Sequence, residues 1–159
     1  MKNFREKILD KTKLAAACDA ERRNGKKIVT CNGSFDLFHC GHLLFLEYAK
    51  SQGDILVVGL NSDISIKEYK SENRPIVPEK ERSQIIAALE IVDYVYIFDE
   101  TVPMPFIEIV KPDFHANGAE YGADCIEAET VKKYGGEIYL VPRIDGLSTT
   151  QLIQKIKNS

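Results

Sequence analysis

The sequence predicts an α/β fold: a Rossmann-like, doubly wound sheet of about five parallel strands with an N-terminal capping helix. Short apolar runs of strand length alternate along the chain with longer segments of helical periodicity. Residues 55–60 form a continuous apolar run, as expected for a strand that helices cover on both faces. With 159 residues, the chain has the length of one ordinary domain, and we predict a single domain over 1–159.

Each predicted element is bounded by residues that commonly start or stop helices. Asn24-Gly25 closes the N-terminal helix, Pro78 opens a later one and Gly135-Gly136 ends another. The expected strands are 26–32, 54–60, 94–98, 114–117 and 137–141. The expected helices are 4–23, 41–51, 78–89, 101–110, 125–134 and an amphipathic segment after Ser148. A helix between consecutive strands predicts right-handed parallel crossovers, which place ligands at the carboxyl ends of the strands.

Residues 28–46, IVTCNGSFDLFHCGHLLFL, are the most informative stretch of the chain. Their order predicts a strand, a tight turn and a helix start, with Gly33 allowing the turn and Gly41 a close approach of backbone amides. The unpaired amides and the dipole at a helix N-terminus favour an anion. His39 and His42 would lie at the same end and donate hydrogen bonds to phosphate oxygens that gain charge during transfer. The stretch therefore predicts a triphosphate site.

The residue types alone leave two other interpretations of this stretch open. Two histidines beside a glycine also occur as surface residues or as metal ligands. Cys40, between them, adds a zinc interpretation, but the sequence has no second Cys/His cluster at ligand spacing, so we predict no resident metal site. The third histidine, His115, falls within a predicted strand, where we expect it to be packed or hydrogen-bonded rather than catalytic.

The composition excludes several partners. A net charge of −3 gives no general attraction to nucleic acid or to an anionic membrane, so bound phosphate has to be held by a local cluster of cations. No apolar run approaches the roughly 20 residues that a membrane span requires, and the charged N-terminal segment does not read as a secretory signal. The four cysteines are scattered without a C-x-x-C pair, which indicates free thiols in a reducing compartment. We therefore expect a cytoplasmic protein.

Basic residues follow the second predicted strand. Asn61 ends that strand, and residues 67–75 read as a polar, basic loop. A charge run is commonly only a solvated face. Lys67, Lys70 and Arg82 nevertheless flank the end of the strand, where they are placed to reach a triphosphate at the first site. The residues alone leave both interpretations open.

A second candidate anion site precedes the terminal helix. Gly146, the hydroxyl groups of Ser148, Thr149 and Thr150, and the bare amides of a helix start would hold the far phosphates. The simpler interpretation is that Ser148 is only an N-cap.

Together, these motifs resemble the nucleotidyltransferase (cytidylyltransferase-like) family, and within it the heptose-phosphate adenylyltransferases. The shared features, from Lys7 onward, are the G-S-F-D turn with H-C-G-H, N-S-D after the second strand, the K-x-x-K loop with Arg74-Pro75, Arg82 and the closing D-G-L-S-T-T. The resemblance implies nucleotidyl transfer from a nucleoside triphosphate to a sugar phosphate with release of pyrophosphate and with Mg²⁺ as cofactor. ATP and heptose 1-phosphate, giving ADP-heptose, are the expected pair, and a homodimer is the expected assembly.

The resemblance also implies a role for individual residues. Catalytic roles fall to His39, His42, Lys67, Lys70 and Arg82. Nucleotide-binding roles fall to Gly33, Ser34, Phe35, Asp36, Gly41, Asn61, Asn117, Gly118, Glu120, Arg143, Ser148, Thr149 and Thr150. Asp36 is expected to orient the turn or the metal shell, and Mg²⁺ to draw charge from the leaving pyrophosphate.

Two departures leave the substrates open. Arg143 matches the R-T-E-G-I-S-T-T pattern of the glycerol-3-phosphate cytidylyltransferases better than the heptose one, so CTP with an alcohol phosphate is the alternative. Where the heptose enzymes read K-G-G-D-Y, residues 117–121 read N-G-A-E-Y, in the loop expected to contact the base or the sugar. A non-catalytic nucleotide-binding module would not need paired histidines, and a Rossmann dehydrogenase would need a G-x-G-x-x-G that is absent after the first strand.

Overall fold

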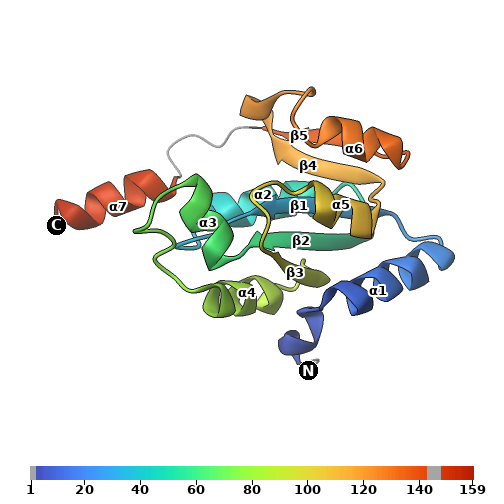
Figure 1. Ribbon diagram of the computed structural model, residues 1–159, viewed down its shortest axis with the longest axis horizontal. Coiled ribbons are helices and arrows are strands. Elements are labelled where there is room, and N and C mark those ends of the chain that lie inside the picture. Colours follow the sequence, from blue (N-terminus) through green and yellow to red (C-terminus); the bar gives the residue numbers. More distant parts are fainter. Residues whose placement is uncertain (1–2, 143–147) are drawn as a thin grey trace.

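The computed structural model describes residues 3–142 and 148–159, which form a parallel sheet covered by helices on both faces (Figure 1). Its strands are β1 (Ile28–Gly33), β2 (Ile55–Asn61), β3 (Tyr94–Phe98), β4 (Phe114–Gly118) and β5 (Glu137–Val141). Their order across the sheet is β3-β2-β1-β4-β5, and every neighbouring pair is parallel. The predicted doubly wound α/β fold is confirmed.

Helices connect the strands and divide between the two faces of the sheet. They are α1 (Lys11–Arg23), α2 (Cys40–Lys50), α3 (Asp63–Tyr69), α4 (Glu79–Ala88), α5 (Met104–Val110), α6 (Ala128–Lys133) and α7 (Thr149–Lys157), with 3₁₀ turns η1 (Phe4–Lys7) and η2 (Ala119–Tyr121). Buried side chains of α2 and α4 belong to the core on one face, and those of α1, α5 and α6 to the core on the other. In the part of the chain that the structure describes, no helix is long and apolar enough to cross a membrane.

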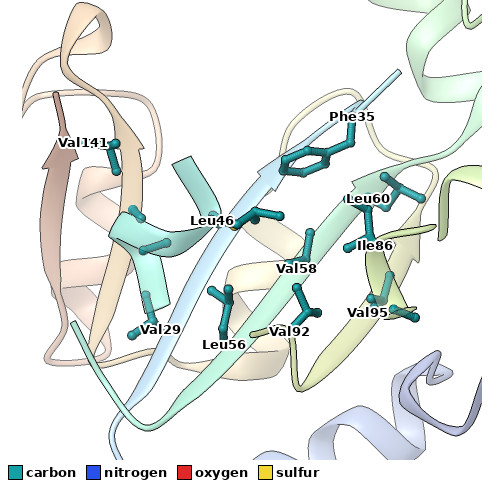
Figure 2. Close-up of a cluster of buried hydrophobic side chains, with 14 residues drawn as sticks. Val29, Phe35, Leu46, Leu56, Val58, Leu60, Ile86, Val92, Val95 and Val141 are labelled. Carbon is teal, nitrogen blue, oxygen red and sulfur yellow. The ribbon is translucent and has the colours of Figure 1, made fainter. Parts of the chain in front are cut away.

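The hydrophobic core under α2 and α4 includes side chains of β1, the strand that leads into the histidine turn. Val29 of β1, Val58 of β2, Leu46 of α2 and Ile86 of α4 are fully buried in one cluster (Figure 2). Burying a side chain of this size stabilises a fold by about 1.5–3 kcal/mol relative to exposure. Phe35, just beyond β1, belongs to the same cluster. The turn after β1 is therefore anchored to the core.

On the opposite face, Gly59 lets α5 approach β2. All seven residues of β2 are buried, which agrees with the continuous apolar run in the sequence. A Cβ atom on Gly59 would lie 2.7 Å from ring atoms of Phe106, closer than packed carbon atoms come. Without a side chain at 59, the Phe106 ring packs directly on the strand.

The N-terminal helix differs from the prediction, which ran unbroken from 4 to 23. The structure has a short 3₁₀ turn, then an extended segment whose Leu9 amide donates to the Val95 carbonyl (2.9 Å) beside β3. Helix α1 starts only after Asp10, whose carboxylate accepts from the Lys13 amide (2.9 Å). An N-cap of this kind fixes where a helix begins, because it satisfies an amide that has no partner within the helix.

The segment after β2 also differs from the prediction, which had a basic loop there. Residues 63–69 form helix α3, capped by Ser62, whose hydroxyl accepts from the Ser65 amide (3.1 Å). Ser65 and Ile66 are buried on its inner side. Lys67 consequently lies on a helix, and only the segment from Lys70 onward is a loop.

Candidate active site

A cavity of about 1030 Å³ lies at the carboxyl ends of the strands, where a parallel sheet is expected to bind its ligand. Of the predicted site residues, the cavity is lined by Gly33, Ser34, Phe35, His39, Gly41, His42, Asn61, Lys70, Asn117, Gly118, Glu120, Ser148 and Thr149. Asp36, Lys67, Arg82 and Thr150 are not among the described residues that line it. Arg143 lies outside the described residues.

The two histidines cap the N-terminus of α2. The Gly41 amide donates to Nδ1 of His39 (3.1 Å), and the His39 amide donates to Nδ1 of His42 (3.4 Å). The two contacts form a reciprocal capping box, which satisfies amides at a helix start. The rings stack with centroids 3.8 Å apart. The helix therefore begins at Cys40 and orients both imidazoles.

These contacts define the protonation of the pair. Because each Nδ1 accepts an amide hydrogen, the N–H of each neutral ring is at Nε2. Burial lowers the pKa of His39. Burial, followed by the charges of His39 and Lys70, lowers the pKa of His42 to about 4. Both rings are neutral at pH 7, so each offers one Nε2–H as a hydrogen-bond donor.

Thr149, the first residue of α7, contacts this pair. Its hydroxyl lies 3.3 Å from Nε2 of His39 and donates to the Asp36 carbonyl (3.2 Å). With the proton of His39 on Nε2, the imidazole donates to Thr149. Ser148 is the N-cap of α7, as predicted, and accepts from the Gln151 amide (3.2 Å). The start of α7 and the start of α2 therefore meet at one wall of the cavity.

The turn between β1 and α2 is strained at positions that the sequence did not indicate. We expected Gly33 to allow the turn, but Gly33 ends β1 and does not have a positive φ. The left-handed conformations fall on Phe35 (φ 47°) and Leu37 (φ 50°). Such a conformation costs about 1–2 kcal/mol for a residue with a side chain. The strain therefore has to be offset by contacts around the turn.

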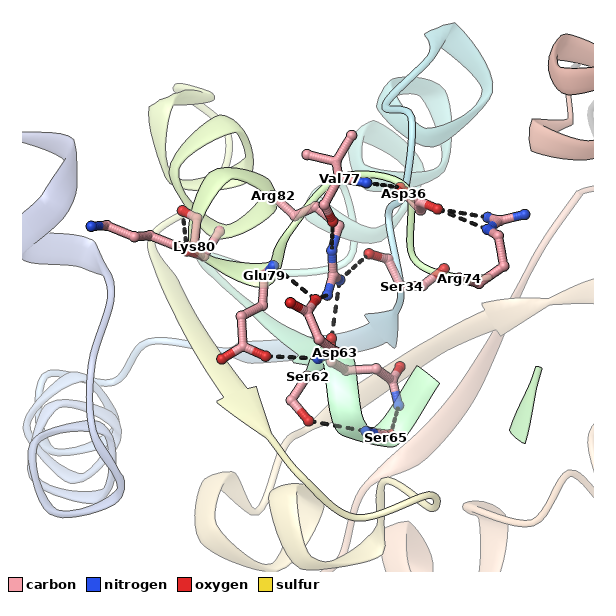
Figure 3. A network of polar contacts seen from close by, with 12 residues as sticks. Ser34, Asp36, Ser62, Asp63, Ser65, Arg74, Val77, Glu79, Lys80 and Arg82 are labelled. Carbon is pink, nitrogen blue, oxygen red and sulfur yellow. Dashed lines mark hydrogen bonds and ion pairs between the residues drawn. The ribbon is translucent and has the colours of Figure 1, made fainter. Parts of the chain in front are cut away.

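Asp36, between the two strained residues, supplies those contacts (Figure 3). It is 1% exposed, accepts from the amides of Ile76 and Val77 (2.9 Å each) and pairs with Arg74 (2.8 Å). Burial raises the pKa of this carboxyl group, but the two amides and Arg74 outweigh burial and hold the pKa below its usual value. The geometry is that of a residue that orients the turn.

Arg82 belongs to the same buried network and not to the cavity (Figure 3). It is 1% exposed and donates to the carbonyl oxygens of Ser34 (2.5 Å) and Asn61 (3.0 Å). It also donates to the Val77 carbonyl (2.8 Å) and pairs with Asp63 (2.8 Å). The prediction that Arg82 neutralises phosphates does not fit this geometry, because its donors hold the protein's own backbone.

The two lysines of the K-x-x-K motif are placed differently. Lys70 lines the cavity, and its Nζ donates to the Ser34 hydroxyl (3.0 Å). Surrounding protein desolvates the Lys70 ammonium, and with the charge of Arg74 this lowers its pKa. Lys67 is exposed on α3 and does not line the cavity. Of the two predicted phosphate-binding lysines, the structure brings only Lys70 to the histidines.

The opposite wall of the cavity follows β4 and includes residues that the sequence analysis did not single out. Asp124, Cys125 and Glu127 line it, together with the predicted Asn117 and with Tyr121, which belongs to the predicted 117–121 loop. Glu127 is 7% exposed and accepts from Nδ2 of Asn117 (3.2 Å). Their position in the loop after a strand's carboxyl end was the signal that could have identified them.

His115 is buried, as predicted. It is fully buried, and its Nδ1 lies 2.8 Å from the Thr30 hydroxyl, within the sheet. Its Nε2 is the one buried side-chain nitrogen or oxygen without a hydrogen-bond partner in the part of the chain described. Among the described residues, no group of three His, Cys, Asp or Glu side chains is placed to hold a metal ion.

The sequence around this site matches that of known proteins. The family model for cytidylyltransferase-like proteins matches residues 30–155, from β1 to α7. Bifunctional protein HldE of Geobacter metallireducens is 48% identical over 151 residues, and HldE of Geobacter sulfurreducens is 46% identical over 144. The matches cover 94% and 90% of this chain. The chain spans about a third of the length of these relatives, 31% and 29%.

Solved structures agree with the sequence matches. A lipopolysaccharide core biosynthesis protein from Thermoplasma volcanium is 31% identical, with a TM-score of 0.62 over 76% of this chain and 98% of that one. Pantoate-beta-alanine ligase from Francisella tularensis shares the fold at 17% identity, with a TM-score of 0.64 over 96% of this chain and 78% of the ligase. The family match runs from the strand that precedes the histidines to the helix that contacts them, and the chain belongs to the cytidylyltransferase-like family.

Proposed function

We propose that the protein transfers the adenylyl group of ATP to a heptose 1-phosphate, giving ADP-heptose and pyrophosphate. The observation that carries this proposal is the pair of neutral imidazoles at the cavity wall, each with an Nε2–H. The choice of sugar rests on the resemblance to heptose-phosphate adenylyltransferases and on the HldE relatives. The proposal concerns this chain and not the remaining two thirds of those relatives.

The chemistry needs little more than positioning and charge stabilisation. An oxygen of the acceptor phosphate attacks the α-phosphorus in line, the bond from that phosphorus to the bridging oxygen breaks, and pyrophosphate leaves. Because a phosphate anion is already a nucleophile, no covalent protein intermediate is needed. His42 donates Nε2–H to the α-phosphate oxygens as these gain charge, and His39 does so when a phosphate oxygen replaces the Thr149 hydroxyl as the acceptor of its Nε2–H.

The remaining phosphates are held by groups on either side of the histidines. Lys70 contributes a positive charge at the cavity wall, and Ser148 and Thr149 contribute hydroxyl groups at the start of α7. Mg²⁺ would be held chiefly by the triphosphate itself, since it is commonly bound by phosphates, waters and one or two carboxylates. Once bound, it would supply positive charge to the leaving pyrophosphate.

The test is a matrix of donors and acceptors. The protein is incubated with each of the four ribonucleoside triphosphates and Mg²⁺, with heptose 1-phosphate or glycerol 3-phosphate, and pyrophosphate is measured. ATP with heptose 1-phosphate is expected to give the highest kcat/KM, and reactions without an acceptor give the background. Faster turnover of CTP with glycerol 3-phosphate would replace this proposal with the cytidylyltransferase alternative.

We further propose a cytoplasmic homodimer. Cys18, Cys31, Cys40 and Cys125 are all free thiols, as suits a reducing compartment.

Helix α7 is amphipathic, yet none of its residues is buried, and Leu152 and Ile153 are only half-buried. A second copy would cover this apolar face. Light scattering on the purified protein should give a mass near 36 kDa, twice the 17.9 kDa of one chain, whereas the mass of a single chain would contradict the dimer.

A further inference from the structure

The two ends of the cavity present opposite hydrogen-bonding chemistry. At the α2 and α7 end, His39, His42 and Lys70 offer donors. At the β4 end, the charged side chains among the described residues are carboxyl groups, those of Glu120, Asp124 and Glu127. Phosphates belong at the first end. An organic group with N–H or O–H donors belongs at the second.

Among these carboxyl groups, only Glu127 is buried. It is 7% exposed, whereas Glu120 and Asp124 are exposed at the cavity rim. One oxygen of Glu127 accepts from Nδ2 of Asn117 (3.2 Å), and Oδ1 of Asn117 accepts from the Gly118 amide (3.0 Å). Asn117 is thereby fixed at both ends of its amide, and it holds Glu127 in place. The Cys125 thiol also hydrogen-bonds to Glu127. A carboxyl group has two oxygens with several lone pairs, so Glu127 can accept from a ligand donor in addition.

Apolar side chains line the cavity beside Glu127. Cys125, buried, precedes it and lines the cavity, as do Val141 and Pro142 at the end of β5. Val141 pairs with Gly118, directly after Asn117, so the end of β5 lies beside the Asn117–Glu127 pair. Apolar walls with one well-placed polar group are typical of sites that bind the ring of a ligand.

We propose that Glu127 determines which nucleobase is accepted, by receiving a hydrogen bond from the exocyclic amino group of adenine or cytosine. The inference rests on the proposed nucleotidyl transfer and adds to it the recognition of an amino base. A base with a carbonyl group at the same position, hypoxanthine or uracil, turns lone pairs toward the carboxyl oxygens. An unmade hydrogen bond to a buried charged group changes binding by about tenfold or more.

The experiment uses two pairs of nucleotides, ATP with ITP and CTP with UTP. The members of each pair differ in that group and in the ring nitrogen beside it, which accepts in the amino base and carries a hydrogen in the carbonyl base. Each nucleotide is titrated calorimetrically with Mg²⁺ into the wild type, into Glu127→Gln and into Glu129→Gln. The amide introduced by Glu127→Gln retains an oxygen that can accept from Asn117 and gains an N–H that suits a base carbonyl. Glu129 is exposed on α6 and does not line the cavity, so Glu129→Gln makes the same change of charge outside the site.

The wild type is expected to bind the amino member of its preferred pair at least tenfold more tightly than the carbonyl member. Glu127→Gln should reduce that ratio about tenfold or more, and Glu129→Gln should leave it unchanged. Because the ratio compares two ligands on one protein sample, partial unfolding of a variant does not alter it. The responsive pair shows whether the base is adenine or cytosine.

An unchanged ratio in Glu127→Gln would overturn the inference. A raised KM for the acceptor phosphate in the same variant would then place Glu127 against the sugar. Failure of the proposed function shows differently: a protein that binds ATP over ITP through Glu127 but releases no pyrophosphate with any acceptor would keep the inference and lose the transferase.

Discussion

Two polar regions lie side by side around residues 33–36, and their hydrogen-bond donors have different partners. In the cavity region, the Nε2–H groups of His39 and His42 and the ammonium of Lys70 lie at the wall of an open space. In the buried network, Asp36 and Arg82 are each 1% exposed and bonded to backbone (Figure 3). The comparison shows that a hydrogen-bond donor is a candidate for ligand binding when it faces a cavity. When the protein's own carbonyl groups accept from it, its role is structural.

The largest effect is expected from the buried network. Arg82→Ala removes a donor from the carbonyl groups of Ser34 and Asn61, and it leaves the Asp63 carboxylate with the Glu79 amide but without its ion pair. Removing one partner from such a network typically costs about 3–5 kcal/mol of stability. Urea unfolding should show this loss, with a smaller one in Arg82→Lys, which keeps the charge but not the fork. Arg82→Ala with wild-type stability and a raised KM for the triphosphate would move Arg82 into the phosphate site.

Substitution in the histidine pair should lower activity rather than stability. His42→Ala removes a donor to charge that develops in the transition state, so kcat should fall by about a hundredfold with a modest change in the KM for the nucleotide. His42→Asn keeps an N–H and should recover part of the loss. Steady-state kinetics checks both variants, with the melting temperature recorded beside them. If kcat in His42→Ala stayed at the wild-type value, His42 would leave the mechanism.

A smaller effect separates the two lysines. Lys70→Ala should raise the KM for the triphosphate about tenfold, since a charge at the cavity wall binds phosphate in the ground state as well. Lys67→Ala is the matched control and should stay within about twofold of the wild type, because Lys67 is exposed on α3. Equal effects of the two substitutions on KM would mean that α3 is placed differently when nucleotide is bound.

The smallest effect concerns the third histidine, which shares the low pKa of His42 but not its place. Burial lowers the pKa of His115 to about 4, below its usual 6.5, so the unfolded chain takes up this proton first. The free energy of unfolding is therefore not reduced by His115 above pH 6.5, and His115 lowers it progressively as the pH falls toward 4. Urea unfolding of His115→Gln between these pH values should show a shallower decline, with kcat within about twofold of the wild type. A decline as steep as in the wild type would assign it to other groups.

The sequence predicted the architecture well, because the signals were local. The strands 94–98 and 137–141 were placed with the observed boundaries, since turn residues flank short apolar runs. The predicted basic loop, 67–75, was wrong over residues 67–69, which belong to helix α3; a helix of seven residues is too short for periodicity to identify. Its cap, Ser62 with Ser65, was the available signal.

The site was harder to predict, because it depends on long-range contacts. His39 and His42 were identifiable, since a strand, a turn and a helix start place them at a ligand site whatever the rest of the chain does. The role of Arg82 was not identifiable, because it follows from Ser34, 48 residues earlier in the chain. Glu127 was missed although its contact with Asn117 spans only ten residues. Its place after the carboxyl end of β4 was the available signal, but its burial was not readable from the sequence.

The Arg82 contacts also bear on the order in which the molecule forms. The guanidinium holds the carbonyl groups of Ser34 and Asn61, 48 and 21 residues earlier in the chain. Contacts across such separations form only after the entropy of closing the intervening loops has been lost. During synthesis, the histidine turn therefore leaves the ribosome well before the side chain that holds it. We expect a nascent chain that stops before α4 to lack the nucleotide site even where β1 and β2 have paired.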